Sequence, residues 1–255
     1  MAPGAAPWPV DAAVTTRHGG MSTGPYASLN LGLHVGDDPR LVIENRRRAA
    51  VALGCGLADM VFCHQTHGRE VAVVGDGDRG RGTQSADDAV PCDALVTATP
   101  GVGIAVMVAD CVPLVLYEPE AHVVAAVHAG WRGTVARVAT AAVDAMTGLG
   151  ADPARVVAGL GPAVTADRYQ VGDDVADAAR ACFGADIDGI VRPDGAGRWV
   201  FDLWAANRRV LVEAGVSPAH IEVSDVGTGP GTPFFSDRTA RPCGRFAAMA
   251  RLRPR

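Results

Sequence analysis

The chain contains no lysine, and all 23 of its basic residues are arginine. Catalysis through a lysine Schiff base and nucleotide binding through a P-loop lysine are therefore excluded. Its six cysteines are scattered without a C-x-x-C pair, and a chain of 255 residues buries enough apolar surface to fold without disulfides. We therefore expect the cysteines to be free thiols.

Signals for a membrane, for export and for nucleic acid are also missing. No apolar run reaches the ~18 residues of a membrane span, and the start MAPGAAPWPVDAA lacks the charged beginning and long apolar middle of a signal peptide. The formal net charge of -5 differs from the basic surface of most nucleic-acid-binding domains. We expect a cytoplasmic protein that binds small molecules, with neither a membrane nor a nucleic acid as partner.

Hydrophobic residues make up 48% of the chain and form short runs without an internal repeat. These runs predict strands near residues 11–16, 60–66, 93–97, 102–110, 112–118, 122–128, 155–160, 199–203, 219–224 and 244–252. Helical patterns cover residues 37–54, 133–150, 172–184 and 202–215. Strands outnumber helices and do not alternate with them regularly, which predicts a mixed α/β fold rather than a barrel or a doubly wound sheet. We expect one domain over residues 10–255 after a disordered segment over residues 1–9.

One hydrophobic hairpin carries side chains suited to a metal ion. The stretch VADCVPLVLYEPEAHVVAAVHAGWRG, residues 108–133, places Cys111 and His128 in two apolar strands. If the chain turns at residues 119–120, Cys111 lies opposite His128 with Cβ atoms about 4.5–5.5 Å apart. A thiolate and an imidazole at that separation can bind one zinc ion. Pro113 weakens this register because it cannot donate to the strand ladder.

A third ligand is available in CHQTHGREV, residues 63–71, which carries His64 and His67 after a predicted strand. The spacing does not decide between these two histidines. Three Cys and His ligands leave a fourth position open, as expected of catalytic rather than structural zinc. The simpler interpretation is that each residue alone is buried for packing, as free cysteines commonly are.

A series of motifs, in order over about residues 14–252, resembles the YfiH-like laccase-domain family: TRHGGMSTGPYASLNLGLHVGDD, HQTHG, CDALVT, ADCVPL, HAGWRGT, GLGPAV, YQVGDDV, and FFSDR followed by GRFAAMA. The resemblance implies an αββα layered fold and one zinc ion held by His67, Cys111 and His128, since the family usually has another residue where His64 stands. It also implies purine nucleoside phosphorylase activity together with adenosine deaminase activity. Members were once named polyphenol or multicopper oxidases, but seven histidines without an H-x-H pair are too few for several coppers.

Two departures from the family pattern concern substrate contacts. Gly227 and Thr228 stand where a Cys-Thr pair is common, so a thiol expected near the site is absent. Asp237 and Thr239 stand where an aromatic residue and a second arginine are usual. Both departures leave the three implied zinc ligands in place.

Phosphorolysis requires a site for a phosphate dianion beside the ribose of the nucleoside. Arginine suits phosphate because its guanidinium donates two parallel hydrogen bonds, and the candidates are Arg17, Arg46 and Arg238. For Arg46, an exposed helix face is the simpler interpretation. Asn30 and Phe235 are further candidates for substrate contacts, with a turn and the core as their simpler roles.

Deamination would use zinc to lower the pKa of a water molecule toward ~7 for attack at C6 of adenine. Asp110, next to Cys111, is the candidate proton carrier. Strand alternation turns its side chain toward the other face, and the same carboxylate would equally suit orienting a ligand.

The leading hypothesis is a zinc-dependent purine nucleoside phosphorylase with one zinc ion, phosphate as co-substrate, and Cys111, His128 and Asp110 as catalytic residues. Its nucleoside would be adenosine, inosine, guanosine or methylthioadenosine. A metal-free cysteine hydrolase, with Cys111 as nucleophile and His128 as base, uses the same hairpin. A non-enzymatic metal- or nucleotide-binding module is the third alternative.

Overall fold

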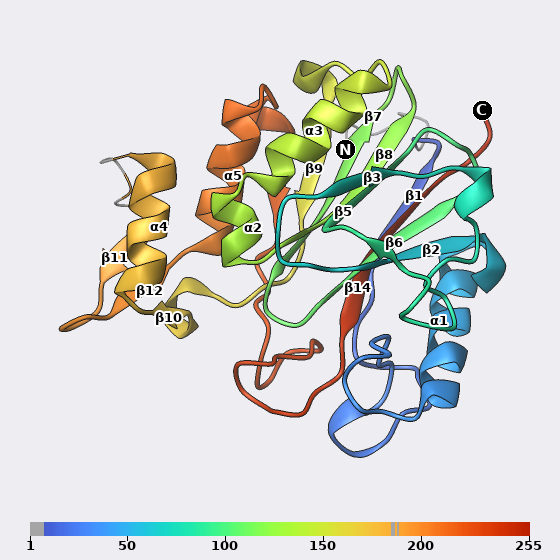
Figure 1. Ribbon diagram of the computed structural model, residues 1–255, viewed down its shortest axis with the longest axis horizontal. Helices are drawn as coiled ribbons and strands as arrows, with labels where there is room; N and C mark the ends of the chain where they lie inside the picture. The colour runs from blue at the N-terminus through green and yellow to red at the C-terminus, as the bar shows by residue number, and fades with distance from the viewer. Residues whose placement is uncertain (1–7, 185–186, 188) are drawn as a thin grey trace.

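Two large β-sheets packed face to face form the body of the molecule in the computed structural model, which describes residues 8–184, 187 and 189–255 (Figure 1). The five-stranded sheet has the order β1 (Val10–Val14), β14 (Phe246–Leu252), β6 (Gly103–Val108), β2 (Met60–His64), β4 (Val90–Pro91). The six-stranded sheet has the order β13 (Ile221–Val223), β9 (Val157–Leu160), β7 (Val112–Glu118), β8 (Val123–Ala129), β5 (Ala94–Thr97), β3 (Val71–Val73). Each sheet contains parallel and antiparallel pairs, which confirms the mixed α/β prediction.

Helices cover the outer faces of both sheets. The apolar side of α1 (Pro39–Leu53) packs on the five-stranded sheet. On the six-stranded sheet lie α2 (Trp131–Val135), α3 (Val138–Gly148) and α5 (Leu203–Glu213). A separate apolar layer from β2, β6, β14, β5 and β8 fills the space between the sheets. The order helix, sheet, sheet, helix is the αββα sandwich that the family resemblance implied.

The capping residues predicted for α1 are present, whereas the helix predicted over residues 133–150 is divided into two. The Asp38 carboxylate accepts a hydrogen bond from the Arg40 backbone N–H, and Gly54 ends the helix at φ 89°. Between α2 and α3, Arg137 adopts φ 63°, in the left-handed region. A non-glycine residue in that region interrupts the helical path, so one predicted helix becomes two.

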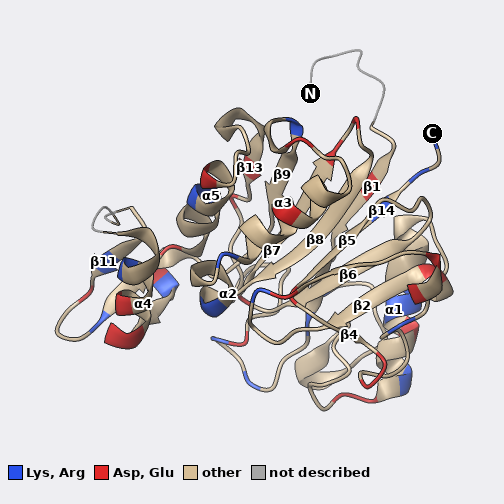
Figure 2. Cartoon of the chain, turned by 45° about the horizontal axis from the view of Figure 1, so that its top comes forward, with Lys and Arg blue, Asp and Glu red and all other residues tan. Residues whose placement is uncertain are grey.

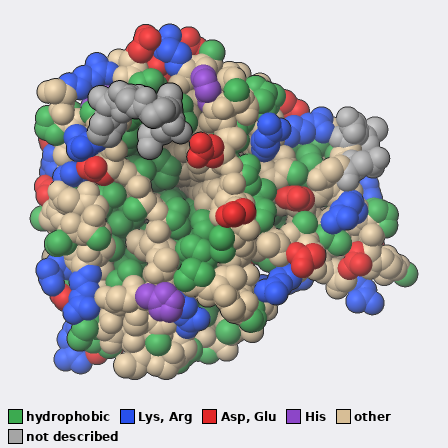
Figure 3. Space-filling model, turned by 180° about the vertical axis from the view of Figure 1, so that it is seen from behind, with side chains coloured by type: hydrophobic (Ala, Val, Ile, Leu, Met, Phe, Trp, Pro, Cys, Tyr) green, Lys and Arg blue, Asp and Glu red, His purple; other side chains and the backbone are tan. Residues whose placement is uncertain are grey.

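A smaller lobe stands beside the sandwich, at the left in Figure 1. It contains α4 (Asp173–Phe183) and a three-stranded sheet of order β10 (Gln170–Val171), β12 (Trp199–Phe201), β11 (Val191–Pro193). Seen from behind, it carries acidic and basic side chains close together (Figure 3). Residues of α4 and β12 belong to the same apolar cluster as α3 and the six-stranded sheet, so the lobe and the sandwich form one domain.

Charged residues lie mainly on helices, loops and strand ends, and the central strands are nearly free of them (Figure 2). All ten strands predicted from the sequence are present, with ends that differ by at most two residues.

Within the described ranges, the helices lack the combination of length and hydrophobicity needed to cross a bilayer. The segment expected to be disordered falls mostly on residues 1–7, which lie outside the described residues.

The β7–β8 hairpin has a different register from the one expected. Its turn takes four residues, 119–122, and Pro113 rather than Cys111 pairs with His128. The predicted pairing of Cys111 with His128 is therefore wrong by two residues. Because side chains alternate with a period of two, a shift by an even number keeps both residues on the same side of the hairpin.

Candidate metal centre

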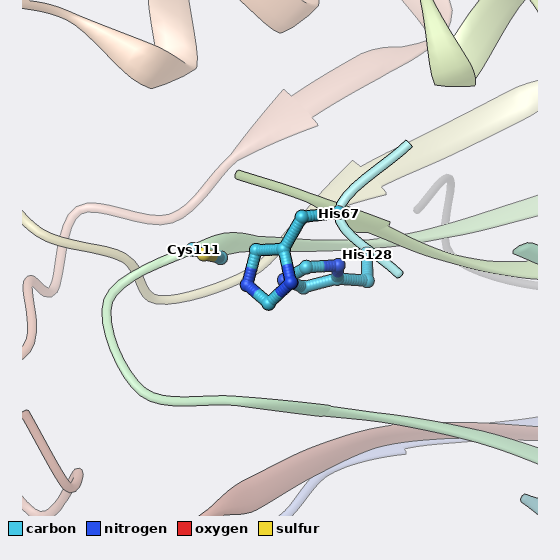
Figure 4. Close-up of side chains that lie close together, drawn as sticks. All are labelled: His67, Cys111 and His128. Carbon is cyan, nitrogen blue, oxygen red and sulfur yellow. The ribbon is translucent and has the colours of Figure 1, made fainter. Parts of the chain in front are cut away.

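Three side chains from separate parts of the fold meet at one end of the sandwich. His67 lies on the loop from β2 to β3, Cys111 immediately precedes β7, and His128 lies in β8 (Figure 4). Their ligand atoms all lie within 4.8 Å of one another. The two imidazole rings are nearly perpendicular, at 85°, with centroids 4.8 Å apart. We call these three residues the His–Cys–His group; His64, the exposed last residue of β2, is not part of it.

The donor set of this group suits zinc. Two imidazole nitrogens and one cysteine sulfur are among the ligands that zinc prefers, with bonds of about 2.0–2.3 Å. A tetrahedral ion with such bonds places its ligand atoms roughly 3.5 Å apart, so small side-chain rotations would close the group around it. Three protein ligands leave one coordination position for a substrate, which is the arrangement of catalytic sites.

A buried carboxylate that the sequence analysis did not single out holds the group in place. Asp93 has no exposed surface, and its Oδ1 lies 2.8 Å from Nδ1 of His128. The same carboxylate accepts hydrogen bonds from the backbone N–H groups of Thr66, His67 and Gly68 and from the Thr66 hydroxyl. An ionised carboxylate only accepts, so the proton lies on Nδ1 of His128 and leaves Nε2 free to bind a metal.

Electrostatics favour an anionic sulfur in this group. Burial raises the pKa of the Cys111 thiol, but His128 and His67 outweigh burial and lower that pKa to about 6. Burial lowers the pKa of His128, but Cys111 and Asp93 raise it to about 9. Burial likewise raises the pKa of Asp93, yet the hydrogen bonds from His128 and Thr66 bring it well below its usual range. The lowered pKa of Cys111 favours the thiolate, which is the form that binds metals.

A cavity of about 460 Å³ adjoins the His–Cys–His group, and all three residues of the group line this cavity. This volume is in the range of pockets that hold small organic ligands. Burial and then the nearby charges of Arg245 and Arg46 lower the pKa of His34, on the cavity wall, to about 4. Of the described residues that line the cavity, two are arginines and one, Asp237, carries a carboxylate. The cavity therefore favours an anion more than the net charge of the chain suggests.

Arg46 is the only one of the three predicted phosphate ligands that lines this cavity. It is 2% exposed, and its guanidinium lies 4.2 Å from the centre of the Phe62 ring. It donates to the backbone carbonyls of Leu31, Gly82 and Thr83. The exposed helix face considered for Arg46 is thus wrong, because this side chain points inward.

The other predicted substrate contacts lie outside the lining of the 460 Å³ cavity. Arg17 and Phe235 line a different cavity, where the guanidinium lies 4.8 Å from the centre of the Phe235 ring. Arg238 donates to the Gln170 carbonyl. Asn30 is fully buried and joins the loop before α1 to the Arg245 backbone N–H.

Asp110 is bound by the segment over residues 228–238 and not by the His–Cys–His group. Its carboxylate accepts hydrogen bonds from the Thr228 hydroxyl at 2.5 Å and from the Arg238 backbone N–H at 2.7 Å. Both oxygens therefore have protein donors. Asp110, at φ 91°, thus ties the segment before Cys111 to the C-terminal loop.

The departure at Gly227 has a steric explanation. A Cβ atom built on Gly227 would lie 2.4 Å from the methyl carbon of Thr165. The Thr165 side chain therefore occupies the space that a cysteine at this position would need. Asp237, the other departure, is paired with Arg245 at 3.0 Å and with Arg241 at 2.6 Å.

A family model described as "Multi-copper polyphenol oxidoreductase laccase" matches residues 11–253. The chain belongs to this laccase-domain, YfiH-like family. Two of its solved members have the same fold. YfiH from Bacillus licheniformis is 38% identical with a TM-score of 0.93, and YlmD from Geobacillus stearothermophilus is 40% identical with a TM-score of 0.92. In each case the match covers 96% of this chain and 93% of the other.

Several relatives in the laccase-domain family carry enzyme names. A protein named purine nucleoside phosphorylase YlmD, from Geobacillus stearothermophilus, is 42% identical over 90% of this chain and 85% of its own length. A purine nucleoside phosphorylase from Deinococcus radiodurans is 44% identical over 80% of this chain and 75% of its own. A protein named adenosine deaminase RL5, from an unknown prokaryotic organism, is 41% identical over 90% of this chain and 88% of its own length.

Proposed function

We propose that the chain is a zinc-dependent purine nucleoside phosphorylase, with adenosine deamination as a second activity. The names of relatives at 41–42% identity, purine nucleoside phosphorylase and adenosine deaminase, support these reaction classes. The observation that carries the proposal is the His–Cys–His group in the wall of a cavity of about 460 Å³. A bound metal ion and a bound nucleoside would meet there.

His67, Cys111 and His128 would hold the zinc ion. When bound, zinc acts as a Lewis acid that polarises a substrate oxygen. Asp93 keeps the proton on Nδ1 of His128 and fixes the loop that carries His67. The His128 ring and the backbone that carries His67 are therefore already oriented, and only small side-chain rotations would be needed to bind the ion.

The walls of the cavity suit the two proposed substrates in different ways. Leu33, Phe62 and Met107 provide apolar surface for a purine ring. Arg245 and Arg46 give the cavity a positive potential that favours phosphate. Adenosine, inosine, guanosine and methylthioadenosine are the candidate nucleosides, since all share the purine and the ribose-like group.

We assign Asp110 a positioning role in preference to proton transfer. Both of its carboxylate oxygens accept hydrogen bonds from protein groups, those of Thr228 and Arg238. Its neighbour Cys111 is thereby held at the entrance to β7. We also propose the cytoplasm as the compartment, since the six free cysteines suit a reducing environment.

Substrate conversion by the purified chain tests the proposed reaction. With inosine, we expect hypoxanthine only when inorganic phosphate is present, together with ribose 1-phosphate. With adenosine, we expect adenine under the same conditions and slow formation of inosine without phosphate. Release of hypoxanthine at the same rate without phosphate would show hydrolysis and contradict phosphorolysis.

The metal-free cysteine hydrolase is a second candidate because His128 lies beside Cys111 and lowers the pKa of its thiol, as the partner of a cysteine nucleophile does. In zinc-free protein, the rate of Cys111 alkylation should rise with pH and be half-maximal near pH 6, since the thiolate reacts and the pKa is lowered to about 6. Zinc should protect Cys111, and a chelator should remove the protection. Equal alkylation before and after chelation, in protein that is catalytically active, would favour the hydrolase.

A further inference from the structure

We propose that a second cavity, formed by Arg17 and the loop over residues 229–243, binds a phosphate group. Its volume is about 190 Å³, and its lining shares no residue with that of the 460 Å³ cavity. We call it the Arg17 cavity. Its volume is below the roughly 300 Å³ at which pockets for drug-sized ligands begin, so it suits a small ion rather than a nucleoside.

Arg17 is held in place but retains free donors. Its Nε donates to the Ala27 carbonyl at 3.0 Å, and its guanidinium lies over the Phe235 ring. The backbone on either side is fixed as well, since the Arg17 N–H donates to Pro233 and its carbonyl accepts from Ser28. Among the described residues, no carboxylate pairs with Arg17, so its two terminal amino groups can bind an oxyanion.

Ser236 provides a second, independent observation in the same cavity. The residue is 5% exposed and lines the cavity. In the described part of the chain, its hydroxyl has no hydrogen-bond partner. A buried hydroxyl without a partner is unfavourable in a folded protein. Rotation of the Ser236 side chain toward the cavity would let this hydroxyl donate to a phosphate oxygen.

The remaining lining is compatible with an anion. Among the residues that the structure describes, one arginine and no carboxylate line the Arg17 cavity. The Cys243 thiol also lines it, and burial raises the pKa of this thiol, so sulfur adds no negative charge at neutral pH. Gly229 and Gly231 have φ values of 113° and 80°, which let the loop curve around the cavity without strain. A fixed guanidinium, an unpaired hydroxyl and the absence of acid together favour a phosphate group.

The Arg17 cavity and the 460 Å³ cavity are lined by neighbouring residues of the C-terminal loop. Ser236 lines the Arg17 cavity, Asp237 lines the 460 Å³ cavity, and the Arg238 backbone N–H binds Asp110 beside Cys111. The inference goes beyond the proposed phosphorolysis, because it requires phosphate binding and no reaction. Two sources share the required chemistry: free inorganic phosphate, and the terminal group of a phosphate monoester.

Calorimetric titration of the full chain with inorganic phosphate tests the inference. We expect Arg17→Met to bind one phosphate per chain fewer than the unsubstituted protein, and Ser236→Ala to bind at this site several-fold more weakly. Arg192→Met is the matched control, since Arg192 is exposed on β11, lines neither cavity and loses the same charge. Phosphate stoichiometry and affinity should be unchanged in that control.

Equal phosphate stoichiometry and affinity in Arg17→Met and in the unsubstituted protein would overturn the inference. If Arg17→Met does not fold, Ser236→Ala decides, and unaltered phosphate binding in that variant would overturn it too. Titration with adenosine 5′-monophosphate separates the sources: tighter binding than phosphate, lost in Arg17→Met, identifies a monoester, and weaker binding identifies free phosphate. Phosphate binding without purine release in any protein would contradict the proposed phosphorylase and leave the Arg17 cavity intact.

Discussion

Asp93 lies directly across the β5–β8 ladder from His128, because Ala94 pairs with Val127 one position further along. This is the cross-strand relation that the sequence suggested for Cys111. The carboxylate connects two of the three candidate ligands, since it binds the His128 ring and the backbone N–H of His67. Its removal should therefore affect metal binding without direct contact with the metal.

We predict that Asp93→Asn lowers zinc affinity by about 10- to 100-fold, as is typical when a group that orients a metal ligand is lost. The amide has the same size as the carboxylate. Its NH2 group, however, can only donate, and it replaces an oxygen that accepted hydrogen bonds from N–H groups. Zinc affinity is measured by competition with a chromogenic chelator. Asp144→Asn, exposed on α3, is the control. Unchanged affinity in Asp93→Asn would show that Asp93 does not position the ligands.

Arg46 shows how a residue predicted for binding also serves the fold. Replacement by Met leaves the carbonyls of Leu31, Gly82 and Thr83 without their buried donor. We expect the free energy of unfolding to fall by about 2–4 kcal/mol. Denaturant unfolding measures this loss, and Arg47→Met, exposed on the same helix, should change stability by less than about 0.5 kcal/mol. Equal effects of the two substitutions would contradict the structural role of Arg46.

At this scale the family motifs indicate all three members of the His–Cys–His group, and the apolar hairpin indicates Cys111 and His128 as well. The sequence does not indicate Asp93, since one carboxylate before the run ALVT has no spacing signal. Only the β5–β8 register reveals its partner. The inward direction of Arg46 is hidden for a similar reason, as three successive arginines in a helix look like an exposed face.

At the scale of elements, the junction between β8 and α2 constrains the candidate centre. A Cβ atom on Gly130 would lie 2.8 Å from the Cys111 sulfur and 3.7 Å from a ring carbon of His67. This junction therefore requires a glycine if Cys111 is to keep its place. The requirement is steric, because the φ of Gly130 is -75°, a value open to any residue.

We predict that Gly130→Ala folds but loses turnover of inosine by about 10- to 100-fold, because the methyl group displaces the Cys111 sulfur. Circular dichroism checks the fold, and a hypoxanthine assay with added phosphate checks turnover. Gly148→Ala provides the control, since a Cβ there meets nothing within 4 Å. Full activity in Gly130→Ala would mean that the sulfur position is not critical.

The long periodic helices are predictable from this sequence, and most of the shortest strands are not. α1, α4 and α5 have caps and periodic apolar faces, and each is present near its predicted range. Four strands of two or three residues, β3, β4, β10 and β11, are too short to show alternation and were not predicted. The hairpin turn has four residues instead of the predicted two, because Pro119 and Glu120 by themselves indicate a two-residue turn.

At the scale of the whole molecule, the two sheets have to meet for the candidate centre to exist. The loop that carries His67 crosses from β2 in one sheet to β3 in the other, and Asp93 lies between β4 and β5, which also belong to different sheets. The sequence predicts the mixed sheets, but their pairing depends on contacts between residues far apart in the chain. The two arginines of the cavity wall, Arg46 and Arg245, are likewise brought together by the fold, although the chain as a whole has a net charge of -5.

Zinc content and phosphate-dependent release of hypoxanthine from inosine, measured side by side in the unsubstituted chain and in Cys111→Ala, test the central claim most directly. We expect about one zinc per chain and phosphorolysis in the first protein, since three ligands hold the ion. In Cys111→Ala we expect a folded protein with little zinc and no hypoxanthine. Phosphorolysis at an unchanged rate in Cys111→Ala would contradict the account.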